Sequence, residues 1–156
     1  MALKTKVSGR IAKPVHEVFE AVVDPSRLSK FFATGPGTKG RLETGATVMW
    51  DFHDFPGAFP VKIIEVVEDK KVVLAWSSQD DAAEGQPFRP HDNTVTIEFE
   101  GLEDGRTLVN ITEEGWGETP KGIRAMTGNT EGWTGMLAAM KVWLEHGINL
   151  RQDFYK

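Results

Sequence analysis

Residues 132–147 read GWTGMLAAMKVWLEHG, and this stretch decides how the rest of the chain must fold. Its large apolar residues recur at the three- and four-residue spacing that lines up on one face of an α-helix. They are Trp133, Met136, Leu137, Met140, Trp143 and Leu144. Gly147 then offers a left-handed helix terminator. The pattern predicts a helix with one broad apolar face, which must be buried against another layer of the fold.

A shorter helical segment is predicted just before this helix. Thr119-Pro120 forms a helix start signal, and Ile123 and Met126 supply an apolar side. Three glycines follow, at positions 128, 132 and 135, and each weakens a helix by roughly 1 kcal/mol relative to alanine. Either another backbone approaches closely at these positions, or the strong helix begins later than Gly128.

The layer that this helix needs is predicted by a series of strands in the middle of the chain. Asn93–Glu100 alternates cleanly between apolar and polar residues, with Val95, Ile97 and Phe99 on one face. Further strands are expected over 4–11, 47–52, 61–67, 71–77 and 107–113, with one more in the region of Gly40. Because short turns separate most of these strands, we expect an antiparallel meander. The polar stretch over 79–92 is interpreted as a loop.

Two short helices are predicted between the first strand and the others. Pro14 suits the first position of a helix over 14–23, whose apolar side is formed by Val15, Val18, Phe19 and Val22. Asp24-Pro25 repeats the start signal, and the second helix would bury Leu28, Phe31 and Phe32. The pair is expected to act as a bent connector.

The composition fits a single domain over 1–156 and excludes several classes of function. With no cysteine, the chain has neither disulfides nor thiolate chemistry. Its net charge of −5 argues against a nucleic-acid partner, which needs a basic surface. Neither a signal peptide nor an apolar run of membrane-spanning length is visible, so we expect a cytoplasmic protein without stable membrane insertion.

An amphipathic helix laid across a curved sheet leaves space between the two layers, and aromatic residues are abundant enough to line it. The chain has five Trp and nine Phe but only one Tyr. We predict a hydrophobic ligand cavity lined by Trp50, Phe52, Trp76, Val95, Ile97, Phe99, Ile111, Trp133, Met136, Leu137 and Met140. Its mouth is predicted at Phe31, Phe32 and Phe88, with the 79–92 loop gating entry.

Catalytic signatures are absent from the sequence, and its four histidines do not pair at metal-ligand spacing. We therefore predict no metal site and no cofactor. Two weak candidates for acid–base chemistry remain. Glu113 follows Ile111 by alternation, so its carboxylate either points into the cavity or, if the strand ends early, reaches water. His53 and Asp54, near a strand end, form the other candidate.

Two motifs carry a family resemblance. The run Ile11-Ala12-Lys13-Pro14-Val15-His16-Glu17-Val18-Phe19, followed by Asp24-Pro25 and Leu28, resembles the opening of the START/Bet v1-like (SRPBCC) superfamily. Gly132-Trp133-Thr134, with Leu137 and Leu144-Glu145 after it, resembles the closing helix of the branch of activator of Hsp90 ATPase homologue 1-like proteins. The resemblance implies an α+β helix-grip fold, in which a curved antiparallel sheet wraps around a long C-terminal helix and an apolar cavity.

The expected function is the binding of a small hydrophobic molecule, such as a lipid, a sterol-like compound or an aromatic polyketide, in preference to catalysis. One alternative is an enzyme of the polyketide cyclase or hydrolase type that uses Glu113, or His53 with Asp54, as a base. Another is a chaperone-linked interaction module with an exposed apolar patch at Phe55, Phe59 and Phe88. Such a patch would also let two copies of the chain form a homodimer.

Overall fold

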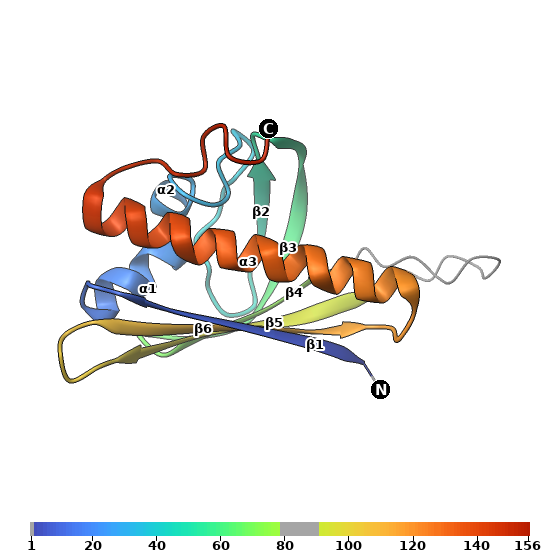
Figure 1. The fold of residues 1–156 in the computed structure, drawn as a ribbon, viewed down its shortest axis with the longest axis horizontal. Helices are drawn as coiled ribbons and strands as arrows, with labels where there is room; N and C mark the ends of the chain where they lie inside the picture. The colour runs from blue at the N-terminus through green and yellow to red at the C-terminus, as the bar shows by residue number, and fades with distance from the viewer. Residues whose placement is uncertain (1, 79–90) are drawn as a thin grey trace.

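The computed structural model describes residues 2–78 and 91–156. These form an antiparallel sheet of six strands, three helices and a C-terminal segment, residues 147–156, that folds back over the molecule (Figure 1). The strands are β1 (Leu3–Ile11), β2 (Thr47–Phe52), β3 (Phe55–Val67), β4 (Lys71–Ser77), β5 (Asp92–Gly101) and β6 (Thr107–Trp116). The helices are α1 (Val15–Val23), α2 (Pro25–Leu28) and α3 (Pro120–His146).

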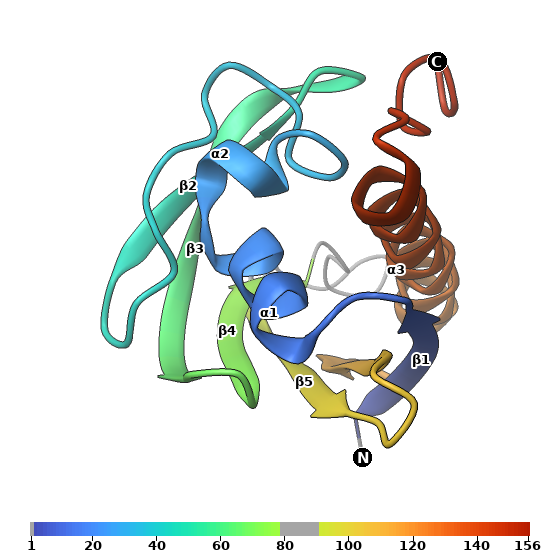
Figure 2. The same ribbon diagram turned by 90° about the vertical axis from the view of Figure 1, so that its left-hand side faces the viewer.

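The strand order is β1-β6-β5-β4-β3-β2, and every neighbouring pair is antiparallel. Only β1 lies out of chain order. It pairs with the last strand, β6, and forms the edge of the sheet opposite β2. Figure 2 shows the sheet curving around α3, with α1 and α2 in front of its open end. The predicted α+β helix-grip architecture is therefore confirmed.

The long helix is continuous, which differs from the predicted division into a short and a strong segment. Thr119 caps its first turn by accepting a hydrogen bond from the Gly122 backbone N–H at 3.0 Å. Gly147 ends it with φ at 68°. Side chains added at Gly128 or Gly132 would meet no atom within 4 Å, so neither position marks a close backbone approach. The apolar stripe packs on the sheet, and this packing stabilises the helix by more than the glycines destabilise it.

The region of Gly40 forms no strand, and the prediction of one there is wrong. It makes an isolated bridge between Lys39 and Met49. The preceding glycines explain the difference, because Gly35 and Gly37 donate their backbone N–H groups to Asp51, each at 2.8 Å. Their contacts wrap this segment around the end of β2 instead of extending it as a seventh strand.

Strand β3 begins at Phe55, earlier than the predicted 61–67. The added part contains Pro56 and Pro60, and proline cannot donate to a ladder. This part of β3 pairs only with β2, and pairing with β4 starts at Lys62. One side of the strand is therefore free of ladder bonds, which lets the prolines stay in register and extends the hairpin beyond the sheet.

Candidate functional site

A pocket of about 610 Å³ lies between the extended β2–β3 hairpin, the end of β4, the middle of α3 and the C-terminal segment. Aromatic side chains form much of its wall. Seven rings contribute, from Phe32, Phe52, Phe55, Phe59, Trp76, Trp133 and Tyr155. The volume falls in the usual range for small-molecule sites, about 300 to 1,000 Å³. The pocket therefore has the size and the chemistry to receive a compact apolar molecule.

The rings form an ordered array in which one face follows another. Trp133 stacks on Phe32 with ring centroids 5.5 Å apart and planes 25° apart. Trp76 makes a tilted contact with Trp133, with centroids 5.2 Å apart and planes 33° apart. Trp50 meets Phe32 and Trp76 edge-on from behind, at 5.4 and 5.6 Å. Edge-to-face and offset-stacked contacts are the favourable arrangements for such rings, so the array supports itself.

Glu113 lies directly behind this array, fully buried. Its two carboxylate oxygens accept hydrogen bonds from the indole N–H groups of Trp76 and Trp133, both at 2.8 Å. The side-chain amides of Asn93 and Asn129 add donors at 3.0 Å, and Asn129 reaches the second oxygen at 3.2 Å. Strand β6 continues to Trp116, so the strand does not end early and Glu113 does not reach water.

A buried ion pair joins the hairpin to the C-terminal segment. Arg151 donates two hydrogen bonds to Asp54, both at 2.9 Å, and the side chains are only 8% and 2% exposed. Burial alone would raise the pKa of Asp54, but the hydrogen bonds and charge of Arg151 outweigh it and hold that pKa below its usual value. The guanidinium also lies over Phe52 and Tyr155, at 5.0 and 4.9 Å from the ring centroids. The pair is thus built into the pocket wall.

Tyr155 fixes the end of the same segment. Its ring packs on Phe55, and its hydroxyl occupies the space where a side chain on Gly135 of α3 would begin. Burial raises the pKa of the phenol. Among the described residues the hydroxyl has no hydrogen-bond partner. Gly135 is therefore the one helix glycine of the three that serves a close approach.

The structure divides the predicted lining into two groups. Phe32, Phe52, Trp76 and Trp133 line the pocket. The others belong to the buried core and do not reach it: Phe31, Trp50, Val95, Ile97, Phe99, Ile111, Met136, Leu137 and Met140. The reason is that α3 packs directly onto the sheet along β1 and β6, whereas the pocket lies at the hairpin end. Phe88 and residues 79–90 of the predicted loop lie outside the described residues.

The histidines do not come together. His53 contacts the Thr34 hydroxyl, whereas His91 contacts the Gly115 carbonyl at 2.8 Å. Asp54, the predicted partner of His53, is held by Arg151 instead. Phe55 and Phe59, predicted as part of an exposed interaction patch, both line the pocket, and Phe55 is also 49% exposed. The two predicted phenylalanines therefore belong to the pocket wall, whereas His53 and His91 do not line it.

Sequence reasoning missed Asn129, Arg151 and Tyr155. Asn129 precedes Trp133 by one helical turn, and this spacing was the available signal for a shared face. Arg151 and Tyr155 follow the helix terminator in a stretch without periodicity. Their partners Asp54 and Gly135 are distant in sequence, so no local pattern could have indicated them.

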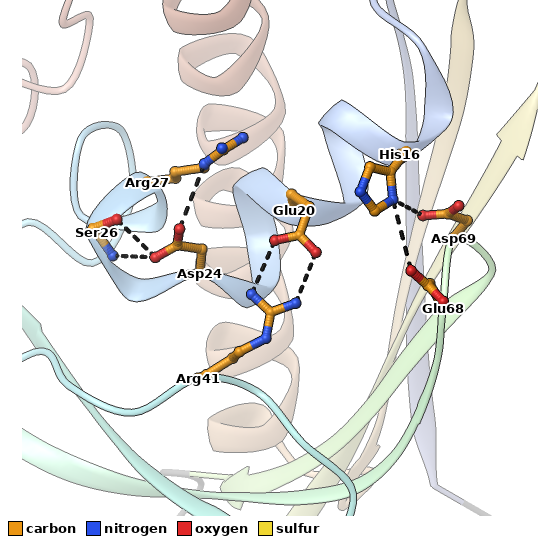
Figure 3. Close-up of polar contacts among 8 residues, drawn as sticks. All are labelled: His16, Glu20, Asp24, Ser26, Arg27, Arg41, Glu68 and Asp69. Atoms are coloured by element: carbon orange, nitrogen blue, oxygen red, sulfur yellow. Dashed lines mark hydrogen bonds and ion pairs between the residues drawn. The ribbon is translucent and has the colours of Figure 1, made fainter.

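A second polar cluster lies at the N-terminal end of α1 and is shown in Figure 3. His16 contacts Asp69 at 2.7 Å, with Glu68 at 4.0 Å, and these three residues are the one group within residues 2–78 and 91–156 whose geometry could hold a metal ion. The hydrogen bond and charge of Asp69 raise the pKa of His16. Because His16 and Glu68 are exposed, we interpret the cluster as a surface contact between α1 and the β3–β4 turn.

In the described part of the chain, no helix combines the length and apolarity needed to cross a membrane. Comparisons with known proteins support the fold. The chain resembles the solved structure of SSP2350 from Staphylococcus saprophyticus at 27% identity, covering 96% of each chain with a TM-score of 0.76. It also resembles the Aha1 dimer from Colwellia psychrerythraea, at 20% identity over 93% of this chain and 98% of that one, with a TM-score of 0.71.

A third solved structure, CalU16 from Micromonospora echinospora, matches at 20% identity over 92% of this chain and 75% of that one, with a TM-score of 0.68. No curated protein matches. The model of one protein family, "Activator of Hsp90 ATPase homolog 1-like protein", matches residues 12–145, which is most of the sequence. With its helix-grip fold and this match, the chain belongs to the activator of Hsp90 ATPase homologue 1-like family.

Proposed function

We propose that the protein binds a small, largely apolar molecule with aromatic rings in the pocket beside α3. The observation that carries this proposal is the ordered array of aromatic faces around a volume of about 610 Å³. Flat ring faces gain most from a flat partner, since offset stacking adds about 0.5 to 1.5 kcal/mol per ring pair beyond the burial of area. The site therefore suits an aromatic polyketide-like compound better than a flexible lipid chain.

Arg151 would orient such a ligand. Two of its nitrogens, Nε and Nη2, are occupied by Asp54, and among the described residues none accepts a hydrogen bond from Nη1. The residue lines the pocket. A carbonyl, phenolate or sulfonate oxygen on the ligand could accept that hydrogen bond, and hydrogen bonds to charged groups contribute about 1.5 to 3 kcal/mol. We therefore expect a ligand with an apolar ring body and an acceptor at one edge.

Two fluorescent probes with the same ring system test both the binding of an apolar ring body and the hydrogen bond from Arg151. N-phenyl-1-naphthylamine is uncharged, and 1-anilinonaphthalene-8-sulfonate adds an acceptor. We expect both to bind with energy transfer from tryptophan, and the sulfonate to bind about tenfold more tightly. Equal affinities of the two probes would show that Arg151 does not take part in ligand recognition. Absence of binding by either probe would contradict the proposed function.

A matched pair of glycine variants locates the bound probe. Gly132 lines the pocket, and an added Cβ there meets nothing within 4 Å. Gly128 lies one turn earlier, is equally open, and does not line the pocket. Gly132→Leu should fill part of the pocket and abolish probe binding, whereas Gly128→Leu should bind as the unmodified protein does. Equal binding by the two variants would place the probe elsewhere.

A further inference from the structure

We propose that Glu113 is the positioning residue of the pocket: it sets the orientation of the Trp76 and Trp133 rings and does not act as a base. The inference rests on the proposed function only in assigning those rings to ligand binding. The hydrogen bonds themselves stand independently of any ligand.

The position of Glu113 in the sheet explains why its carboxylate is held rigidly. It lies inside β6, opposite Thr5 of β1 and Val95 of β5, so its backbone is fixed from both sides. The side chain points to the inner face and is 0% exposed. It is not part of the pocket wall. A ligand in the pocket would therefore touch the indoles and not the carboxylate.

The four donors come from three different elements. Trp76 belongs to β4, Asn93 to β5, and both Asn129 and Trp133 to α3. The carboxylate therefore ties the helix to two strands behind the pocket. Each oxygen takes one indole N–H, which divides the pair of oxygens between the two tryptophans. One side chain thus controls two walls of the site together.

Fixing an indole N–H fixes the plane of its ring. Trp76 and Trp133 have their centroids 5.2 Å apart, so a rotation of one would disturb the other. Phe32 stacks on Trp133 and would follow it. Without the carboxylate, two indole donors would be buried without an acceptor, and buried polar groups are rarely left so. The Trp76 and Trp133 rings would then rotate toward other hydrogen-bond acceptors, and the ring array would lose its present arrangement.

The same contacts argue against a role in acid–base catalysis. All the side chains that hydrogen-bond to Glu113 donate to it, and their donors occupy both oxygens. Within residues 2–78 and 91–156, the side-chain groups that hydrogen-bond to it are the neutral N–H groups of two tryptophans and two asparagines, and no Lys, Arg or His forms an ion pair with it. A base needs a free lone pair facing the substrate. Glu113 offers none to the pocket.

Nuclear magnetic resonance of the indole N–H groups tests the proposal directly. In Glu113→Gln, an amide of the same shape presents an NH2 group to one of the two indoles. We expect the Trp76 and Trp133 indole proton resonances to move upfield, and the affinity for N-phenyl-1-naphthylamine to fall roughly tenfold, equivalent to one well-placed aromatic contact. The resonances are assigned with single Trp→Phe variants.

Trp116→Phe is the matched control. Trp116 is also fully buried and also donates its indole N–H, to the Ser78 carbonyl at 3.2 Å, but it neither contacts Glu113 nor lines the pocket. This variant loses a buried indole hydrogen bond and should keep both the two resonances and the probe affinity. A loss of affinity equal to that of Glu113→Gln would overturn the proposal, because any buried indole bond would then matter equally.

The outcomes separate this inference from the proposed function. If the two resonances stay in place in Glu113→Gln, the positioning role is wrong, whatever the probe does. If they move but the unmodified protein binds no probe, the proposed function fails and Glu113 still orients the rings. Should Glu113→Gln not fold, Glu113→Asp decides instead, because its shorter side chain keeps a carboxylate but draws it away from both indoles. The two resonances must then move together while that of Trp116 stays, and unmoved resonances overturn the role.

Discussion

Gly135 lies in the middle of α3, where alanine is normally the better residue for a helix. The hydroxyl of Tyr155 fills the space that an added methyl group would need. At this position the cost of glycine in the helix is offset by the docking of the C-terminal segment. Asp54 and Arg151 are a second case in which a residue's role comes from a distant partner.

Gly135→Ala should release the end of the C-terminal segment, since the new methyl group overlaps the Tyr155 hydroxyl. Arg151 is buried in the unmodified protein, so we expect trypsin to cleave after it slowly. We expect cleavage after Arg151 to become roughly tenfold faster in the variant, because local opening becomes easier. Mass spectrometry of timed digests measures the rate. An unchanged rate would show that Tyr155 does not hold the segment.

The ion pair predicts how stability depends on pH. The pKa of Asp54 is lower in the folded protein than in the unfolded chain, where it is about 3.9. The pair therefore stabilises the fold fully above that unfolded value, and the contribution is lost as pH falls through the lower, folded pKa. Asp54→Asn should flatten the acid side of a urea-unfolding series measured against pH. A variant with the same acid slope as the unmodified protein would contradict this assignment.

At the scale of elements, α3 combines a strong apolar stripe with a glycine-rich first half. The three glycines serve different purposes, although the sequence presents them alike. Gly132 opens onto the pocket, Gly135 receives Tyr155, and Gly128 faces open space. Gly132 and Gly135 thus leave room beside α3 for the pocket and for the docked C-terminal segment.

Gly128→Ala should therefore stabilise the protein, by about 0.5 to 1 kcal/mol, because it removes the backbone entropy cost of glycine without a clash. Thermal unfolding is expected to shift upward by about 2 to 4 °C per kcal/mol for a chain of this size. Gly135→Ala is the contrasting case, since the same substitution in the same helix there overlaps the Tyr155 hydroxyl. A fall in melting temperature would mean that Gly128 has a neighbour when the protein is in solution.

At the scale of the whole molecule, the site is assembled from parts that are far apart in sequence. The hairpin supplies one wall, α3 another, and the C-terminal segment turns back over the helix toward the hairpin to supply a third (Figure 1). The helix-grip core lies beside this site and would remain if the segment were absent, because α3 packs along β1 and β6.

A chain that ends at Gly147 should fold with its α3 packing intact but bind N-phenyl-1-naphthylamine about tenfold more weakly, since Arg151 and Tyr155 leave the wall. Circular dichroism checks the fold and fluorescence titration checks the affinity. Full affinity in the shortened chain would show that the C-terminal segment is no part of the site. A homodimer of the intact chain stays a prediction, which light scattering of the purified protein would decide.

The architecture follows from local patterns in the sequence. The stripe from Trp133 to Leu144 and the alternation through Val95, Ile97 and Phe99 are local patterns, and local periodicity dictates which faces must be buried. The position of the pocket, in contrast, follows from contacts between residues that are distant in the sequence. That location depends on Glu113 meeting two indoles, on Arg151 reaching Asp54, and on Tyr155 docking at Gly135. Such pairings join residues of different elements, and their energy exists only once the chain has brought them together.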